Sequence, residues 1–252
     1  MSYPPAAPIR LDEDWHVHST FSDGKDTMER DVEVAGERGL RLLCLVDHVR
    51  AETDWVGDFV AEARRVGDEA SLAVLCGVET KMLDTLGELD LPRDFGLADR
   101  LLIADHQLPT PTGPMDPGEA RGLIEQGDLA AGTAVRWLVE ASSNALEAHP
   151  GAILAHSLSI LPKLGLAPSA FTAEHEERLV AALQASGGCL EISERWRCPG
   201  VSLARRAIAA AVPVIASTDS HKATDIGLYD YCGEVVAALE RDSARAGGGA
   251  PD

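Results

Sequence analysis

The chain has 252 residues, with 22 Lys and Arg against 41 Asp and Glu, so its formal net charge is −19. That length suits one α/β barrel, and 45% apolar with 25% charged residues is typical of a folded globular protein, not of a disordered or membrane-spanning one. Because Lys and Arg supply the affinity for a nucleic-acid backbone, the acidic charge argues against long nucleic acid as a partner.

Short apolar segments alternate with longer amphipathic ones along most of the chain. The predicted strands are the segment that runs into His16 and His18, then residues 41–48, 71–79, 100–106, 152–157, 189–193 and 212–221. The predicted helices are residues 27–38, 56–70, 131–147, 173–186 and 201–211. Strands that alternate with helices long enough to cross over predict a parallel sheet in an α/β fold.

The remaining segments set the predicted domain boundaries. Residues 107–132 are rich in Pro and Gly, which predicts a loop or lid with a short helix. We expect one barrel domain over residues 10–240, an N-terminal extension over 1–9 and a flexible tail over 241–252. The five cysteines are widely spaced, the N-terminus lacks a signal-peptide pattern, and no apolar run approaches the roughly 18 residues of a membrane span. We therefore expect a cytoplasmic protein that does not bind membranes.

Most histidines of the chain follow predicted strands. Six of the eight lie at C-terminal strand ends, namely His16, His18, His48, His106, His156 and His221, and carboxylates at such ends include Glu79, Asp105 and Asp219. In a parallel barrel these ends converge on one face, and two residues spaced i and i+2 on a strand point the same way. Imidazole and carboxylate donors without cysteine predict a site for zinc, manganese or iron. His149 and His175 lie in predicted loop or helix and are expected to be solvated.

The segments DWHVHSTFSDG, LVDH, CGVE, ADH, LAHS and STDSH, in this order, resemble the polymerase and histidinol phosphatase (PHP) family over roughly residues 10 to 236. The resemblance implies a single distorted (β/α)7 TIM-like barrel with a metal cluster at the C-terminal face of the strands. It implies two or three divalent metal ions (Mn, Zn or Fe) and the ligands His16, His18, Asp23, His48, Glu79, His106, His156, Asp219 and His221. Asp23 also precedes a glycine, a pattern typical of an ordinary turn.

The same resemblance implies hydrolysis of a phosphate ester. A metal-bridging hydroxide would attack phosphorus in line, and Asp219 or His221 would assist proton transfer to the leaving alcohol. We expect a small phosphorylated metabolite as the substrate, either histidinol phosphate or a sugar or nucleoside phosphate. The alternatives are a phosphodiesterase or exonuclease acting on nucleotides or short oligonucleotides, a non-catalytic metal-binding module, and a hydrolase acting on another bond. No expected ligand is missing, which favours an active enzyme.

Basic residues close to the predicted ligands are candidates for binding the phosphate. They are Arg50, Lys81, Arg195, Arg197 and Lys222. The planar guanidinium group can donate two hydrogen bonds to phosphate oxygens, so Arg195 and Arg197 are the first choices. The alternative is that these cations pair with neighbouring surface acids. Two aromatic residues, Trp55 and Trp196, follow ligand-bearing strands and could either stack on a substrate ring or pack into the protein.

Overall fold

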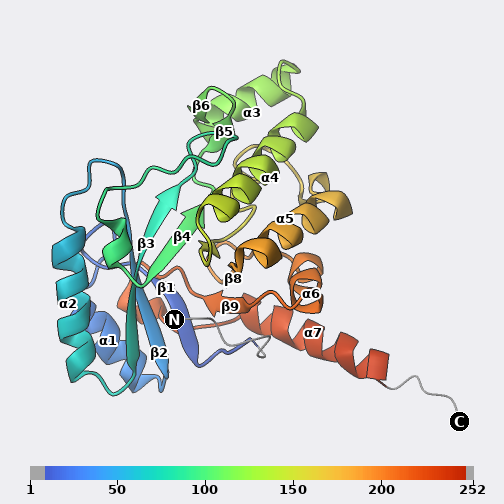
Figure 1. The fold of residues 1–252 in the computed structure, drawn as a ribbon. Helices are drawn as coiled ribbons and strands as arrows, with labels where there is room; N and C mark the ends of the chain where they lie inside the picture. Colours follow the sequence, from blue (N-terminus) through green and yellow to red (C-terminus); the bar gives the residue numbers. More distant parts are fainter. Residues whose placement is uncertain (1–8, 248–252) are drawn as a thin grey trace, which may run out of the picture.

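The computed structural model describes residues 9–247, and within them seven parallel strands form one curved sheet (Figure 1). The strands lie side by side in the order β1 (Glu13–Val17), β2 (Leu42–His48), β3 (Ala73–Lys81), β4 (Arg100–Ala104), β7 (Ile153–Leu154), β8 (Cys189–Ser193) and β9 (Val214–Ser217). This order follows the sequence. Because neighbouring strands are parallel, each crossover segment returns the chain to the end of the sheet at which the next strand begins. All seven strands overlap segments that the sequence predicts.

The sheet closes where its first and last strands meet. Val17 forms a parallel bridge with Ser220, and the backbone N–H of His18 donates to the Ser220 carbonyl at 2.8 Å. The strand β7 has only two residues, so the barrel is irregular opposite this seam. The predicted distorted (β/α)7 barrel is therefore confirmed.

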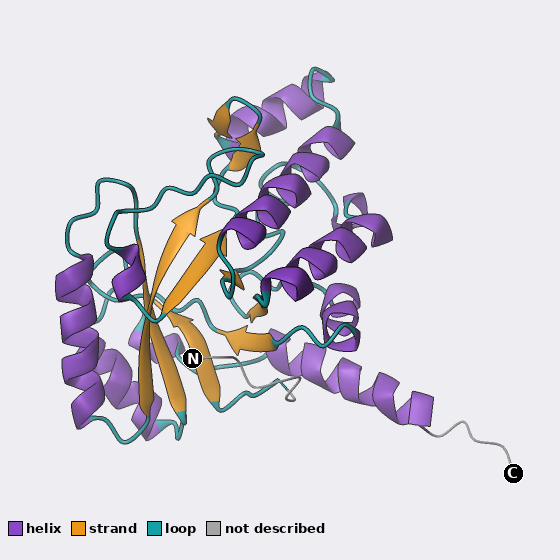
Figure 2. Ribbon diagram, in the orientation of Figure 1, coloured by secondary structure: helices purple, strands orange, loops and turns teal. Residues whose placement is uncertain are grey.

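The helices cover the outside of the barrel (Figure 2). They are α1 (Met28–Glu37), α2 (Val56–Glu69), α3 (Pro117–Gln126), α4 (Ala131–Ala148), α5 (Ala173–Ser186), α6 (Val201–Ala209) and α7 (Tyr231–Gly247), with short 3₁₀ turns at Phe95–Leu97, Pro168–Ala170 and Ala223–Asp225. One core cluster packs α1 and α2 against the first three strands, and a larger one packs α4 to α7 against the later strands. Both are mainly aliphatic. None of the helices in residues 9–247 has the length and apolarity needed to cross a membrane.

Two segments carry more structure than the sequence predicts. Residues 107–132 contain the predicted short helix, α3, and also an antiparallel hairpin of β5 (Leu108–Thr110) and β6 (Gly113–Met115). Helix α7 was not predicted, and it continues past residue 240, where we expected the tail to begin. The cause is the run of good helix formers in AALERDSARA, which favours continuation to Gly247. The rest of the expected tail, residues 248–252, and most of the expected N-terminal extension lie outside the described residues.

Candidate metal centre

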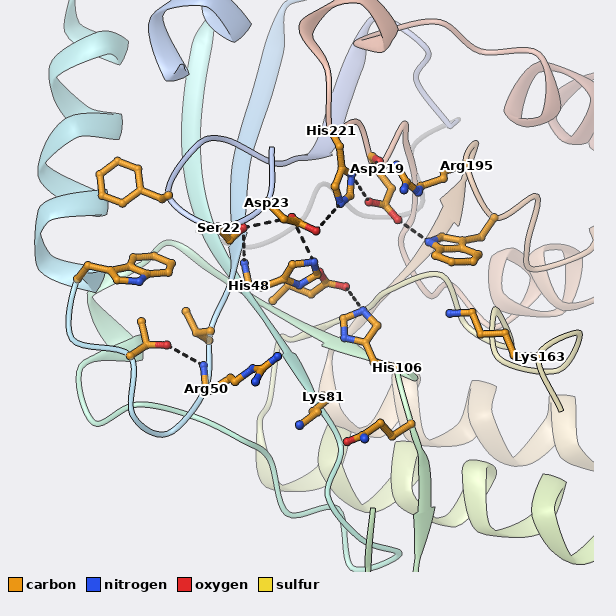
Figure 3. Close-up of a pocket in the computed structure, with 17 residues that line it drawn as sticks. Ser22, Asp23, His48, Arg50, Lys81, His106, Lys163, Arg195, Asp219 and His221 are labelled. Atoms are coloured by element: carbon orange, nitrogen blue, oxygen red, sulfur yellow. Dashed lines mark hydrogen bonds and ion pairs between the residues drawn. The ribbon is translucent and has the colours of Figure 1, made fainter. Parts of the chain in front are cut away.

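The strand ends bring all nine predicted ligand residues to one end of the barrel. Figure 3 labels five of them, namely Asp23, His48, His106, Asp219 and His221. The β1 segment contributes His16 and His18, whose ring centroids are 4.8 Å apart, as expected for residues spaced i and i+2. Both are buried, as are Glu79, His156 and Asp219, while the other four ligand candidates are partly exposed or exposed. The cluster therefore has a buried floor and an open side.

Glu79 lies at the centre of the cluster. Its Oε1 is 2.8 Å from His156 Nε2 and 3.2 Å from His106 Nε2. Its Oε2 is 2.8 Å from His48 Nδ1 and 3.4 Å from His16 Nε2. Each of the two oxygens of this one carboxylate thus faces imidazoles.

Three sets of side chains place their nitrogen and oxygen donors within 4.8 Å of one another. They are His18, Asp23, His48 and His221; His16, His18 and Asp219; and His48, Glu79 and His106. The sets share His18 and His48, so they form one continuous cluster. Because divalent transition metals bind imidazole and carboxylate donors, each set has the chemistry of one metal site.

Asp23 belongs to the cluster because of the turn that carries it. Its Oδ2 lies 3.3 Å from His221 Nε2, and its Oδ1 lies 3.6 Å from His48 Nε2. The next residue, Gly24, packs directly on the backbone of β1, and an added Cβ would lie only 2.3 Å from the His18 carbonyl oxygen. The Asp-Gly pair is therefore a turn, and the turn also presents the carboxylate to the cluster.

The strongest sign that these residues fit metal ions is a group of buried polar atoms without hydrogen bonds. Within residues 9–247 these atoms include Nε2 of His16, both ring nitrogens of His18, Oε2 of Glu79 and Oδ1 of Asp219. A buried polar atom without a partner costs about 1–3 kcal/mol, so native structures rarely keep several together. Here they converge, and all are good donors to a divalent cation. The residues therefore fit bound metal ions.

A second layer of carboxylates holds the ligand rings in place. Glu191 is fully buried, with Oε1 2.8 Å from His16 Nδ1 and Oε2 accepting from the His156 backbone N–H at 2.5 Å. Asp105 lies 3.3 Å from His156 Nδ1 and accepts from the Ser159 hydroxyl at 2.6 Å. Such contacts fix the ring orientation and the tautomer of a ligand histidine. Glu191 was not predicted for this role, although it is the single charged residue in the apolar strand CLEIS.

The charges in the cluster set its protonation. Burial alone lowers the pKa of His16, but the carboxylates of Glu191, Glu79 and Asp219 outweigh it and raise that pKa well above its ordinary value. Burial and the neighbouring His16 lower the pKa of His18 to about 4. Burial raises the pKa of Glu79 and of Asp219, but the surrounding histidines outweigh it and lower both. Both carboxylates are therefore ionised and available as anionic donors.

Two of the ligand candidates have strained backbones. His156 and Asp219 have φ angles of 27° and 51°, which non-glycine residues rarely adopt. Each such residue costs about 1–3 kcal/mol and persists where the surrounding structure holds it in place. Each lies two residues after the end of a strand, and both contact other ligand candidates. The strained turns aim these two side chains into the cluster.

The open side of the cluster is a cavity of about 710 Å³. Apart from ligand candidates, the charged residues among the described lining residues are Arg50, Lys81, Lys163 and Arg195. Arg195 Nη1 lies 3.1 Å from His221 Nδ1. Trp196 donates from Nε1 to Asp219 Oδ2 at 2.6 Å, and Lys163 Nζ lies 4.1 Å from the centroid of its ring. Lys163 was missed from the sequence because it lies in a long loop without periodic pattern.

Two of the predicted phosphate-binding residues do not line this cavity. Arg197 donates to Glu234 at 3.1 Å and lies over the ring of Tyr231, on the side of α7. It is two residues from Arg195, but both lie in a turn, where the chain reverses and neighbouring side chains point apart. Lys222 is exposed beyond the cluster. Arg195, Arg50 and Lys81 do line the cavity.

The two remaining histidines lie outside the cluster. His149 packs edge-on against Phe95, with ring centroids 6.1 Å apart. His175 lies in the first turn of α5, where its Nδ1 accepts from the Thr172 backbone N–H at 3.1 Å. His175 thus stabilises a helix start, which the sequence analysis did not predict.

A model of the PHP domain family matches residues 14–186, more than half of the chain. A phosphoribosyl 1,2-cyclic phosphate 1,2-diphosphodiesterase from Eggerthella lenta is 39% identical over 72 residues, 29% of this chain. The chain matches only 25% of the length of that relative. The histidinol phosphate phosphatase of Lactococcus lactis, solved with zinc, L-histidinol and phosphate, has a TM-score of 0.66 at 16% identity, over 91% of this chain and 92% of that one. This likeness supports the barrel fold.

Proposed function

This chain belongs to the PHP domain family, a family of metal-dependent phosphoesterases, and we propose that it hydrolyses a small phosphate monoester such as histidinol phosphate or a sugar or nucleoside phosphate. The observation that carries this proposal is the convergence of buried donor atoms that lack hydrogen bonds, beneath a cavity whose other charged lining residues are all cationic. A cavity of about 710 Å³ accommodates a metabolite, and the acidic exterior disfavours a long polyanion.

The nine clustered side chains are our proposed metal ligands: His16, His18, Asp23, His48, Glu79, His106, His156, Asp219 and His221. The three donor sets suit two or three divalent ions of manganese, zinc or iron. Such ions, when bound, activate water for attack and neutralise negative charge on phosphate. Glu191 and Asp105 act in this proposal as positioning residues, because they hold the rings of His16 and His156.

The residues of the cavity bind and orient the ester. Arg195 has no carboxylate partner within the described residues and lies beside His221, so its guanidinium group can donate to the phosphoryl oxygens. Asp219 is buried, ionised and hydrogen-bonded to Trp196, which makes it a poor proton donor. Asp219 and His221 both line the cavity, but His221 is partly exposed whereas Asp219 is buried, so His221 is the better placed of the two to protonate the leaving alcohol.

The test is release of inorganic phosphate from a panel of monoesters, with added manganese or zinc and with a chelator control. The panel contains histidinol phosphate, sugar phosphates, nucleoside monophosphates and p-nitrophenyl phosphate. We expect release that the chelator abolishes and added metal restores. The absence of release by protein whose metal content has been measured and found complete contradicts the proposal.

A phosphodiesterase is the second candidate, and the relative from Eggerthella lenta favours it, since the name of that protein describes cleavage of a cyclic phosphate diester. The same cluster and cavity could accept a diester of a nucleotide or a short oligonucleotide. The products separate the two functions, because a diesterase leaves a monoester and a monoesterase releases free phosphate. Mass spectrometry of products from a cyclic nucleotide and from a nucleoside monophosphate makes this distinction.

A further inference from the structure

A second arginine lines the cavity away from Arg195. Arg50 follows strand β2 by two residues, and Figure 3 shows it on the opposite side of the histidine cluster from Arg195. Its backbone N–H donates to Thr53 Oγ1 at 2.9 Å, which fixes the turn that carries it. The guanidinium group itself has no hydrogen-bond or carboxylate partner in the part of the chain that the structure describes.

Many arginines of this protein are already paired with acids. Nine arginines of the described residues contact a carboxylate: Arg10, Arg30, Arg41, Arg65, Arg121, Arg178, Arg197, Arg205 and Arg206. Asp90, which binds the residue after Arg50, is already used, because it accepts from the Ala51 backbone N–H at 2.8 Å and lies 3.4 Å from Lys81 Nζ. Arg50 is thus left facing the cavity in a chain with almost twice as many acids as bases.

The cavity has more positive charge than one phosphoryl group requires. Its lining carboxylates, Asp23, Glu79 and Asp219, all belong to the proposed ligand cluster, and the remaining charged lining residues in the described chain are four cations. Arg195 is placed to bind the phosphoryl group at the cluster. Arg50 and Lys81 lie together below His48 in Figure 3, on the other side of the cluster from Arg195.

We propose that the alcohol part of the substrate carries a second anionic group, a carboxylate or a phosphate, and that Arg50 binds it. This inference rests on the proposed function, which places the first phosphoryl group at the metal cluster. Phe21 and Trp55 also line the cavity, with ring centroids 5.6 Å apart, so the organic part between the two anionic groups has an apolar wall to contact. A substrate whose alcohol part is cationic, such as histidinol phosphate, is then disfavoured by charge.

The test uses phosphonates, whose carbon–phosphorus bond is not hydrolysed, so that binding is measured without turnover. The probes are alkylphosphonates with two or four methylene groups that end in a carboxylate, a second phosphonate, a methyl group or an ammonium group. Calorimetry with the manganese-loaded protein gives each Kd. We expect at least one doubly anionic probe to bind about tenfold more tightly than its methyl counterpart, and the ammonium probe to bind less tightly than the methyl one. The carboxylate and phosphonate probes distinguish the two kinds of anion.

Arg50→Ala should remove most of this preference, and Arg50→Lys should retain part of it. The matched control is Arg64→Ala, which removes the same charge from an exposed position on α2 and should leave the preference unchanged. Equal affinity for the anionic and methyl probes in the wild-type protein, or an undiminished preference in Arg50→Ala, overturns the inference. Hydrolysis of p-nitrophenyl phosphate, measured on the same preparations, tests the proposed function separately: a preference for doubly anionic probes without any hydrolysis contradicts the function and supports the anion site.

Discussion

Asp14 binds Thr218 across the seam where the barrel closes, accepting from its backbone N–H at 2.9 Å and from its hydroxyl at 2.6 Å. Asp14 also accepts from the backbone N–H of Gly227 at 3.0 Å. Thr218 immediately precedes the proposed ligand Asp219. A single buried carboxylate on the first strand therefore fixes the end of the last strand and the loop that carries two proposed ligands.

Replacement of Asp14 by Ala should destabilise the protein, because it leaves buried donors at Thr218 and Gly227 without acceptors. We expect the free energy of unfolding to fall by about 3 kcal/mol, measured by urea denaturation. The control is Asp12→Ala, since Asp12 is exposed and contacts only arginine side chains in the described structure. Equal stability of the two variants would show that the seam does not depend on Asp14.

Loss of a proposed ligand should remove metal without unfolding the barrel. His221→Ala changes a side chain at the open side of the cluster, outside the packed core. We expect reduced metal content by elemental mass spectrometry, with an unchanged far-ultraviolet circular dichroism spectrum. His149→Ala, which changes a histidine outside the cluster, should retain full metal content. Full metal content and wild-type turnover in His221→Ala would refute its assignment as a ligand.

Glu191→Gln tests the positioning of the ligand rings. The change keeps the shape of the side chain but removes the charge that faces His16 Nδ1. We expect metal affinity to fall about 10- to 100-fold, measured by competition with a chromophoric chelator. Glu176→Gln changes another buried acid, one that binds Arg206 away from the cluster, and should leave metal affinity unchanged. Equal affinities in the two variants would exclude a positioning role for Glu191.

Arg195 and Arg197, which lie in one turn, should contribute differently to binding of the ester. Arg195→Ala removes a guanidinium group from the cavity, and we expect KM for the preferred ester to rise at least about tenfold. Arg197→Ala removes one that pairs with Glu234 outside the cavity, so KM should stay within about twofold of wild type. Steady-state kinetics on both variants measures this difference. Equal KM values for the two variants would contradict the orientation of the turn.

Asp31 on α1 should make stability depend on pH. Its two carboxylate oxygens are buried without hydrogen-bond partners in the described residues, and burial, reinforced by Asp26 and Asp47, raises its pKa from 3.8 to about 8. Between these two pH values the folded state keeps a proton that the unfolded chain has released. The contribution of Asp31 to the free energy of unfolding therefore falls as the pH rises from about 4 to about 8.

Asp31→Asn should flatten this decline. We expect the variant to be more stable than wild type at pH 8 by about 2 kcal/mol and nearly equal to it at pH 4, measured by urea denaturation of chelator-treated protein. The control, Glu37→Gln, changes an exposed acid at the other end of α1 and should keep the wild-type slope. A variant as pH-dependent as wild type would show that Asp31 is not the source of the decline.

The strands and the cluster could be predicted from the sequence because the strands are short and apolar, and all of them except β8 carry a polar ligand candidate at or near their C-terminal end. A strand end fixes both the position and the direction of the next side chain, so His48 and Glu79 could be placed from the pattern alone. The spacing of His16 and His18 likewise predicts their shared orientation.

Residues in turns and long loops could not be placed in this way. Arg195 and Arg197 are equivalent by sequence, and only the path of the turn separates the cavity residue from the surface one. Lys163 reaches Trp196 from a loop that has no hydrophobic period. The role of Glu191 was not predicted, because distance along the chain does not reveal that it packs beneath His16.

The closure of β1 against the end of β9 has a consequence for the order of events during synthesis. His18 Nε2 and Asp219 Oδ1 lie 3.3 Å apart, although the two residues are far apart in the sequence. The helices and neighbouring strands can form while the ribosome is still extending the polypeptide, but this contact requires the last strand. The complete cluster therefore arises only after the residues through His221, just past the end of β9, have been made, and before then β1 to β3 present a partial set of the proposed donors.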